Sequence, residues 1–209
     1  MRVVIFDMDG TLIDSKKDIT SSVNYIRKEC YALEPLSEEF VVWAINLEDR
    51  NLAKLFYETD IYESRARDLF EEHYALECTK SVYLYDGVKE LLDLLKNENT
   101  KLSVATNAPS TFAKKMLFHL EVDNYFDYIV GADMVKNPKP SPDMLELILS
   151  SYGFKKDKHR GFMVGDNSKD ILSARASSLT PIFATWGFSR DTTHDKIAKT
   201  PNEVLWFMT

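Results

Sequence analysis

The chain begins with a short, continuous apolar run that ends at an acidic residue. Val3 to Phe6 are all apolar and lead directly into Asp7, with Asp9 and Gly10 close behind. A run of this length, bounded by Asp and Gly, is typical of a strand that is buried on both faces of a parallel sheet. Later runs of the same character cover 101–107, 125–133, 161–166 and 180–187.

Helical patterns separate these runs. The segment 87–98 places Val88, Leu91, Leu92 and Leu95 on one face, and the segments 141–153 and 168–178 are also helical in pattern. Strands that alternate with helices build βα units. The sequence therefore predicts an α/β fold with an open, parallel, Rossmann-like sheet flanked by helices.

The stretch 15–83 differs from the rest because its apolar residues follow helical spacing throughout and no convincing strand interrupts it. We therefore expect an α/β core domain formed by 1–14 and 84–209, with an all-helical domain at 15–83. An insertion directly after the first strand lies beside the usual ligand crevice of an open α/β sheet. This position suits a lid.

Composition narrows the possible partners and compartments. The chain has 209 residues, of which 44% are hydrophobic, and a formal net charge of −7. Such a charge argues against binding nucleic acid or an anionic membrane through bulk electrostatics. Cys30 and Cys78 are the only cysteines, which is too few for a disulfide framework, and they have no metal-binding spacing. A cytoplasmic location is the expectation.

Paired acidic residues at strand ends predict a metal site. Asp7 and Asp9 repel each other unless a divalent cation joins them or one of them is protonated. Asp166 ends another predicted strand, and Asp170 follows it on the same helical face. Carboxylate oxygens suit Mg²⁺. The alternatives are a solvated turn at Asp7 and Asp9 and a helix cap formed by Asp166 with Asn167 and Ser168.

Two further segments could hold a phosphate. Thr106 and Asn107 end a strand and Ser110 opens a helix, so hydroxyl, amide and backbone N–H groups meet there. Lys139 lies between Pro138 and Pro140, which restrict the backbone around it. The alternatives are a simple helix cap and a lysine that points into solvent.

Together these segments resemble the motifs of the haloacid dehalogenase-like phosphohydrolases. The matching segments are DMDGTLIDS, VATN, NPKPSPD and GDNSKD, and KNPKPSPDML and ATWGF are most similar to the phosphoglycolate phosphatase branch. The resemblance implies that Asp7 is the nucleophile and becomes an aspartyl phosphate. It implies that Asp9 is the acid/base, with its backbone carbonyl also facing Mg²⁺. The stretch 15–83 resembles the helical cap of that family.

The same resemblance implies the remaining site residues. Asp7, Asp9 and Asp166 would hold Mg²⁺, with Asp170 as an outer or alternative ligand. Thr106 and Lys139 would hold the transferring phosphoryl group, and Asn107 at the same strand end is a further phosphate-binding candidate.

The expected activity is Mg²⁺-dependent hydrolysis of a small phosphate monoester, with 2-phosphoglycolate as the first candidate. A phosphomutase of the β-phosphoglucomutase kind is the main alternative, as are substrates such as a sugar phosphate, a nucleotide or pyrophosphate. A dehalogenase fits poorly, because displacing a halide needs neither Asp9 nor Mg²⁺. A catalytically silent binding protein on this fold is also possible. The expected partner is a small phosphorylated metabolite, and the chain could be a monomer or a homodimer.

Some residues remain without a decided role. The cap residues that select the substrate could include any of Arg50, Lys54, Arg65 and Arg67. Trp186 either lines the site or anchors the fold. We interpret the basic run at 154–160 as a solvated turn before a buried strand.

Overall fold

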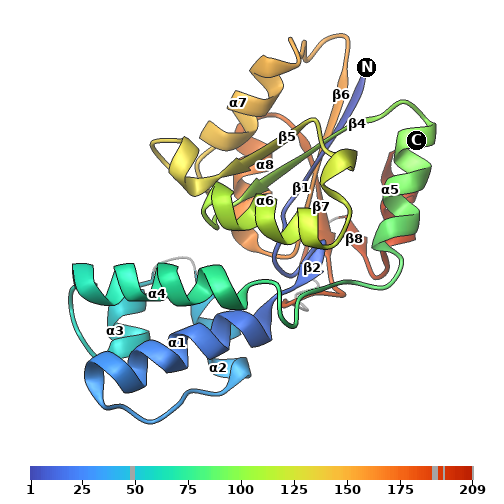
Figure 1. Ribbon diagram of the computed structural model, residues 1–209. Coiled ribbons are helices and arrows are strands. Elements are labelled where there is room, and N and C mark those ends of the chain that lie inside the picture. The colour runs from blue at the N-terminus through green and yellow to red at the C-terminus, as the bar shows by residue number, and fades with distance from the viewer. Residues whose placement is uncertain (48–49, 190–192, 195, 209) are drawn as a thin grey trace. The chain divides into compact units, whose positions relative to one another are not determined.

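The computed structural model describes residues 1–47, 50–189, 193–194 and 196–208. The chain forms two compact units (Figure 1). The first unit consists of Met1–Asp14 and Leu84–Thr209, and the second is Ser15–Tyr83. The short strands β2 (Ile13–Asp14) and β3 (Tyr83–Leu84) pair with each other where the chain passes between the units.

The first unit is built on a six-stranded sheet with the order β5-β4-β1-β6-β7-β8. Its neighbouring strands pair in parallel. The strands are β1 (Arg2–Phe6), β4 (Lys101–Thr106), β5 (Tyr128–Gly131), β6 (Arg160–Gly165), β7 (Thr180–Ala184) and β8 (Ile197–Ala198). The predicted open parallel α/β fold is confirmed. The sequence pattern did not reveal β8, which is only two residues long.

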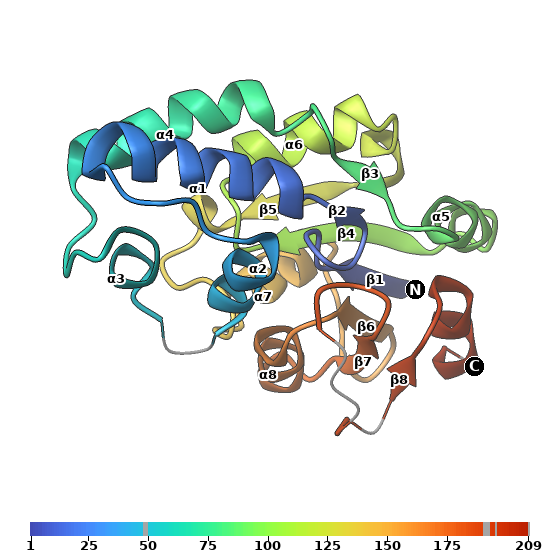
Figure 2. The same ribbon diagram turned by 90° about the horizontal axis from the view of Figure 1, so that it is seen from below.

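Helices cover both faces of this sheet. They are α5 (Val88–Asn97), α6 (Ser110–His119), α7 (Asp143–Ser151) and α8 (Ser168–Ala176). The unit also contains the 3₁₀ turns η1 (Asp123–Tyr125), η2 (Ala132–Met134) and η3 (Pro201–Phe207). Figure 2 shows α7 and α8 on one face and α5 and α6 on the other. The expected helices at 87–98, 141–153 and 168–178 differ from the observed ones by about two residues at most, as is usual for helix ends.

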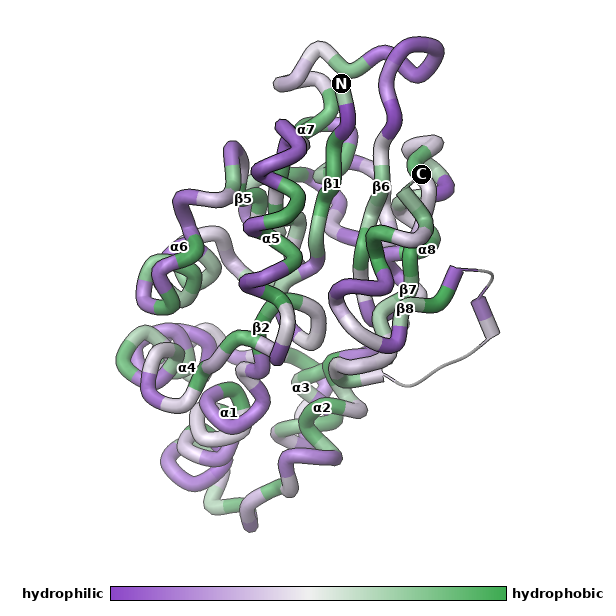
Figure 3. Tube along the Cα trace, turned by 90° about the vertical axis from the view of Figure 1, so that its right-hand side faces the viewer, coloured by the Kyte–Doolittle hydropathy of each residue, from purple (hydrophilic) through white to green (hydrophobic). Residues whose placement is uncertain are grey.

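The packing of the core explains why the strands have continuous apolar sequences. Val3 and Ile5 of β1 pack with Met144 and Ile148 of α7 on one face. The alternate residues Val4 and Phe6 are equally buried. Because helices cover both faces, every residue of the strand after the first is removed from water. Figure 3 shows β1 and β6 hydrophobic over most of their length.

The order of the strands indicates which edge of the sheet binds the ligand. The chain passes from β1 outward to β4 and β5, then returns to β6 on the other side of β1. Such a reversal is the point at which open α/β sheets bind ligands, beyond the carboxyl ends of the strands. The segments that follow β4, β1 and β6 therefore share one edge of the sheet.

The second unit is all-helical. It contains α1 (Lys16–Tyr31), α2 (Glu38–Asn46), α3 (Leu52–Tyr57) and α4 (Ser64–Glu77). Its apolar core includes Val23, Val41 and Phe56. The buried Arg27 donates from Nε to the carbonyl oxygen of Glu34 at 2.6 Å and from Nη1 to that of Phe56. These bonds satisfy carbonyl groups that the short loops leave without helical partners. Neither this unit nor the first contains, in its described residues, a helix long and apolar enough to cross a membrane.

Candidate active site

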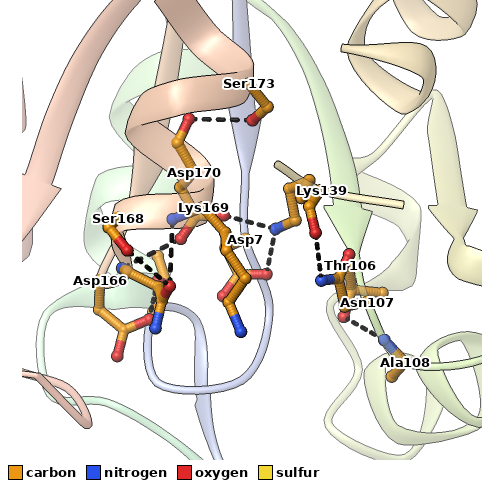
Figure 4. A network of polar contacts seen from close by, with 12 residues as sticks. Asp7, Thr106, Asn107, Ala108, Lys139, Asp166, Ser168, Lys169, Asp170 and Ser173 are labelled. Atoms are coloured by element: carbon orange, nitrogen blue, oxygen red, sulfur yellow. Dashed lines mark hydrogen bonds and ion pairs between the residues drawn. The ribbon is translucent and has the colours of Figure 1, made fainter. Parts of the chain in front are cut away.

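A buried lysine links two carboxylates at the switch point of the sheet (Figure 4). Lys139 Nζ lies 2.7 Å from Asp7 Oδ1 and 2.6 Å from Asp170 Oδ1. Asp7 directly follows β1, Asp170 lies in the first turn of α8, and Lys139 comes from the loop between η2 and α7. Burial works against the charge of Lys139, but Asp170 and Asp7 outweigh it and raise the pKa of this amine above its ordinary value.

The acidic side chains at this edge fit a divalent cation. Asp7, Asp166 and Asp170 are buried, and each offers an oxygen within 4.8 Å of the others. Burial raises the pKa of Asp166 well above its ordinary value, and the charges of Asp7 and Asp170 raise it further. Burial also raises the pKa of Asp170 to about 6, with Lys139 opposing the shift. A hard cation would relieve this repulsion, and an all-oxygen donor set suits Mg²⁺.

Asp166 is held by the loop that follows β7. Its Oδ2 accepts the backbone N–H groups of Phe188 at 3.0 Å and Ser189 at 3.2 Å. The sequence pointed to the acid but not to these donors.

The indole of Trp186 fixes the same loop to the turn after β1. Its Nε1 donates to the backbone oxygen of Thr11 at 2.9 Å, so Trp186 anchors the fold through a polar contact. Gly187 permits this approach, because a Cβ built there would lie 1.5 Å from the backbone oxygen of Gly10. Gly187 in the segment ATWGF is the one feature of the sequence that could have indicated this close contact.

Asp170 has two structural roles. It closes a capping box with Asn167 at the start of α8, where its Oδ2 accepts the Asn167 N–H at 3.1 Å. Its Oδ1 accepts a hydrogen bond from the amine of Lys139. The helix-cap alternative, which the sequence placed at Asp166 with Asn167 and Ser168, is confirmed for Asn167, and this cap coexists with the cluster of acids.

Thr106 and Asn107 lie beside Lys139 at the end of β4. The buried Thr106 hydroxyl oxygen accepts the Ala108 N–H at 3.1 Å, so its own proton stays free for donation. Asn107 Nδ2 donates to the backbone oxygen of Lys139 at 2.9 Å. Asn107 therefore supports the loop that carries the lysine, and its direct contact with a phosphate stays a prediction.

The start of α6 is already occupied by a carboxylate. Asp133 accepts the Ser110 N–H at 2.6 Å and its hydroxyl at 2.8 Å. Ser110 was expected to contribute to an anion cradle, but Asp133 of η2 uses both of its donors. Because this contact joins residues from different βα units, sequence spacing gave no sign of it.

Asp9 follows Asp7 by two residues, in the turn after β1. Its side chain is half-buried and does not belong to the group formed by Asp7, Asp166 and Asp170. Asp9 forms an isolated bridge with Ile13 in the turn after β1. Its acid/base role and its backbone contact with a metal stay predictions, as do the cap contacts of Arg50, Lys54, Arg65 and Arg67.

The sequence profile of the haloacid dehalogenase-like hydrolases matches residues 4–184. The chain belongs to this family. It is 31% identical over 196 residues to a phosphoglycolate phosphatase of Colwellia psychrerythraea, covering 90% of this chain and 85% of that one. It is 32% identical over 188 residues to a phosphoglycolate phosphatase of Aquifex aeolicus, covering 90% and 86%. The prediction of a phosphoric monoester hydrolase of this family is confirmed.

Solved structures share the fold of this haloacid dehalogenase-like hydrolase. A predicted phosphoglycolate phosphatase of Haemophilus somnus has a TM-score of 0.87 at 24% identity, covering 99% of this chain and 97% of that one. A putative beta-phosphoglucomutase of Thermotoga maritima has a TM-score of 0.72 at 25% identity, covering 100% and 98%.

Proposed function

We propose that this protein is a Mg²⁺-dependent phosphatase that hydrolyses a small phosphate monoester through an aspartyl phosphate on Asp7. The observation that carries the proposal is the buried contact of Lys139 with Asp7 and Asp170, with Asp166 in reach of both acids. The curated relatives named phosphoglycolate phosphatase make 2-phosphoglycolate the first substrate to test. Neither Cys30 nor Cys78 forms a disulfide bond in the part of the chain that the structure describes, and we place the activity in the cytoplasm.

Each residue has a defined part in the proposed reaction. A carboxylate oxygen of Asp7 bonds to phosphorus as the bond from phosphorus to the ester oxygen breaks. Asp9 gives its proton to the leaving oxygen and then takes a proton from the water that attacks the aspartyl phosphate. This second attack restores Asp7 and releases inorganic phosphate.

Charge neutralisation is the main requirement of this chemistry, because a phosphate dianion repels a carboxylate nucleophile. The Lys139 amine supplies one fixed positive charge, and the Thr106 hydroxyl can donate to a phosphoryl oxygen. Asp7 and Asp166, with the Asp9 backbone oxygen, would hold Mg²⁺, and Asp170 would be an outer or alternative ligand. The charge of the ion would offset the negative charge of the phosphoryl group.

The experiment is phosphate release from 2-phosphoglycolate, with Mg²⁺ and then with EDTA. We expect a Mg²⁺-dependent kcat/KM of about 10⁴ M⁻¹s⁻¹ or more. Asp7→Asn should abolish turnover and Asp9→Asn should nearly do so. The exposed Asp157→Asn serves as the matched control and should keep full activity. Full activity of either Asp7→Asn or Asp9→Asn would overturn the mechanism.

A phosphomutase is the second candidate, because the putative beta-phosphoglucomutase of Thermotoga maritima aligns over this whole chain. Sugar phosphates, nucleotides and pyrophosphate are the next substrates to assay if 2-phosphoglycolate releases no phosphate. A retained sugar bisphosphate intermediate, with little net phosphate release, would identify the mutase.

A further inference from the structure

A small basic cleft lies at the amino-terminal edge of the sheet, at the opposite ends of the strands from Asp7 and Asp166. Its volume is about 280 Å³. The first residues of β6 and β7 line it, together with the turn 154–159, Lys196 and Phe207. Four segments that are separate in the sequence, 154–162, 178–180, Lys196 and Phe207, therefore contribute to one cleft within the first unit.

The charge of this cleft is opposite to that of the whole chain. Lys156, Arg160 and Lys196 line it beside His159, and its described lining includes no acidic residue. The chain as a whole has 33 Asp and Glu against 26 Lys and Arg. Among the described residues, none of these three cations pairs with a carboxylate. Unpaired like charges that converge on one cleft favour an anion there.

The turn that carries Lys156 is held in place. The Lys155 N–H donates to His159 Nδ1 at 3.0 Å, and the Phe154 ring packs against the imidazole with centroids 5.5 Å apart. The Phe154 N–H donates to the Leu149 oxygen at 2.9 Å, which ties the turn to the end of α7. Because Nδ1 accepts a hydrogen bond, the neutral imidazole carries its proton on Nε2 and can donate it.

Neighbouring groups also position the cations. Lys156 Nζ lies 2.9 Å from Ser178 Oγ, and Lys196 Nζ lies 5.4 Å from the centroid of the Phe207 ring. The Thr180 hydroxyl adds a neutral donor to the lining. Cations that are already placed lose less side-chain entropy when they bind an anion.

We propose that this cleft binds a small oxyanion with at least two negative charges, such as a diphosphate or a phosphorylated metabolite. Lys156 and Lys196 would neutralise it as point charges, and Arg160 would bind two of its oxygens at once. The volume of about 280 Å³ lies just below the usual range of ligand pockets, about 300–1,000 Å³, so a small ligand is favoured. A nucleic acid would need a longer basic face than these residues provide.

The test uses methylenediphosphonate, a diphosphate analogue with a carbon bridge that a phosphatase cannot hydrolyse, titrated into the protein in EDTA by calorimetry. Lys156→Gln/Arg160→Gln removes two cleft charges. Lys155→Gln/Lys158→Gln is the matched control, because it removes two charges from the same turn outside the cleft. We expect the cleft variant to weaken binding about tenfold or more and the control variant to leave the Kd within about twofold. Equal Kd values for the two variants, or no binding by the wild type, would overturn the proposal.

Amide chemical shifts locate the bound anion independently of the variants. Gly161, Ser178 and Thr180 should shift on titration, whereas Thr106 and Gly165 beside the catalytic carboxylates should not. Shifts confined to the second group would place the anion in the active site and overturn the proposal. Thermal unfolding of both double variants checks that they remain folded, which we expect because the substituted side chains are all exposed.

Discussion

The amine of Lys139 lies 2.7 Å from Asp7 Oδ1, although 132 positions separate the two residues in the sequence. Both side chains are almost entirely removed from solvent. A buried carboxylate is stable only when a positive charge or hydrogen-bond donors compensate it. Lys139 therefore places a positive charge beside Asp7 at the point where the proposed reaction needs a nucleophile.

Removing that charge should destabilise the protein. Lys139→Met keeps the length of the side chain but leaves Asp7 and Asp170 as uncompensated buried acids. We expect the free energy of unfolding, measured in urea, to fall by about 3–5 kcal/mol at neutral pH. The exposed Lys136→Met is the matched control and should change it by about 0.5 kcal/mol or less. Equal stability of the two variants would show that Lys139 does not compensate these acids.

Mg²⁺ should stabilise the protein against heat. A ligand that binds only the folded state at 100 times its Kd adds about 2.7 kcal/mol. Asp166→Asn should lose this Mg²⁺-dependent rise in Tm, whereas Asp157→Asn should retain it. Without Mg²⁺, Asp166→Asn should melt at a higher temperature than the wild type, because it replaces one of three neighbouring buried acids by a neutral amide. A full Mg²⁺ response in Asp166→Asn would place the cation elsewhere.

The Trp186 indole should contribute to both stability and metal affinity. Trp186→Phe removes the hydrogen bond to the Thr11 oxygen and should lower the free energy of unfolding by about 1 kcal/mol. Because the same loop presents the Phe188 and Ser189 N–H groups to Asp166, the Kd for Mg²⁺ should also rise. Trp206→Phe, at a side chain that is 68% exposed, is the matched control and should change neither quantity. If the two variants behave alike, the loop does not position Asp166.

The stabilisation that Asp133 provides at the start of α6 should depend on pH. Partial burial alone would raise the pKa of Asp133, but the hydrogen bonds from Ser110 outweigh it and lower this pKa below its ordinary value. A lowered pKa in the folded state means that the stabilisation is present above the unfolded pKa of about 3.9 and is lost as the pH falls through the folded value.

The corresponding variant is Asp133→Ala. At pH 7 it should lower the free energy of unfolding by about 1 kcal/mol, as for the loss of a helix cap, and the difference from the wild type should shrink below about pH 4. Asp157→Ala, an exposed acid in a turn, should show no such pH-dependent difference. If the free energies of unfolding of Asp133→Ala and the wild type still differ by the same amount at pH 3, the capping role is contradicted.

The sequence predicts both the sheet and the helical unit from the spacing of their apolar residues. The apolar runs of β1, β4 and β6 predict buried strands because both of their faces pack against helices, and the helical spacing of 15–83 predicts helices only. Strand β8 was missed because two residues carry no periodicity.

The sequence by itself determined which residues stand at strand ends: Asp7 after β1, Thr106 at the end of β4 and Asp166 after β6. This information is local, because a run of apolar residues and the polar residue that ends it are adjacent in the chain. Only the tertiary structure decided which of these ends meet, since strand order is a property of the packed sheet.

The same distinction applies to contacts that join distant segments. The Asp133 cap on Ser110, the loop that holds Asp166 and the basic cleft shared by Lys156 and Lys196 all depend on how the βα units pack together. The sequence shows the charges and hydrogen-bonding groups of these residues. Their partners are set by the fold, because a hydrogen bond or an ion pair requires a separation of a few ångströms that sequence distance does not encode.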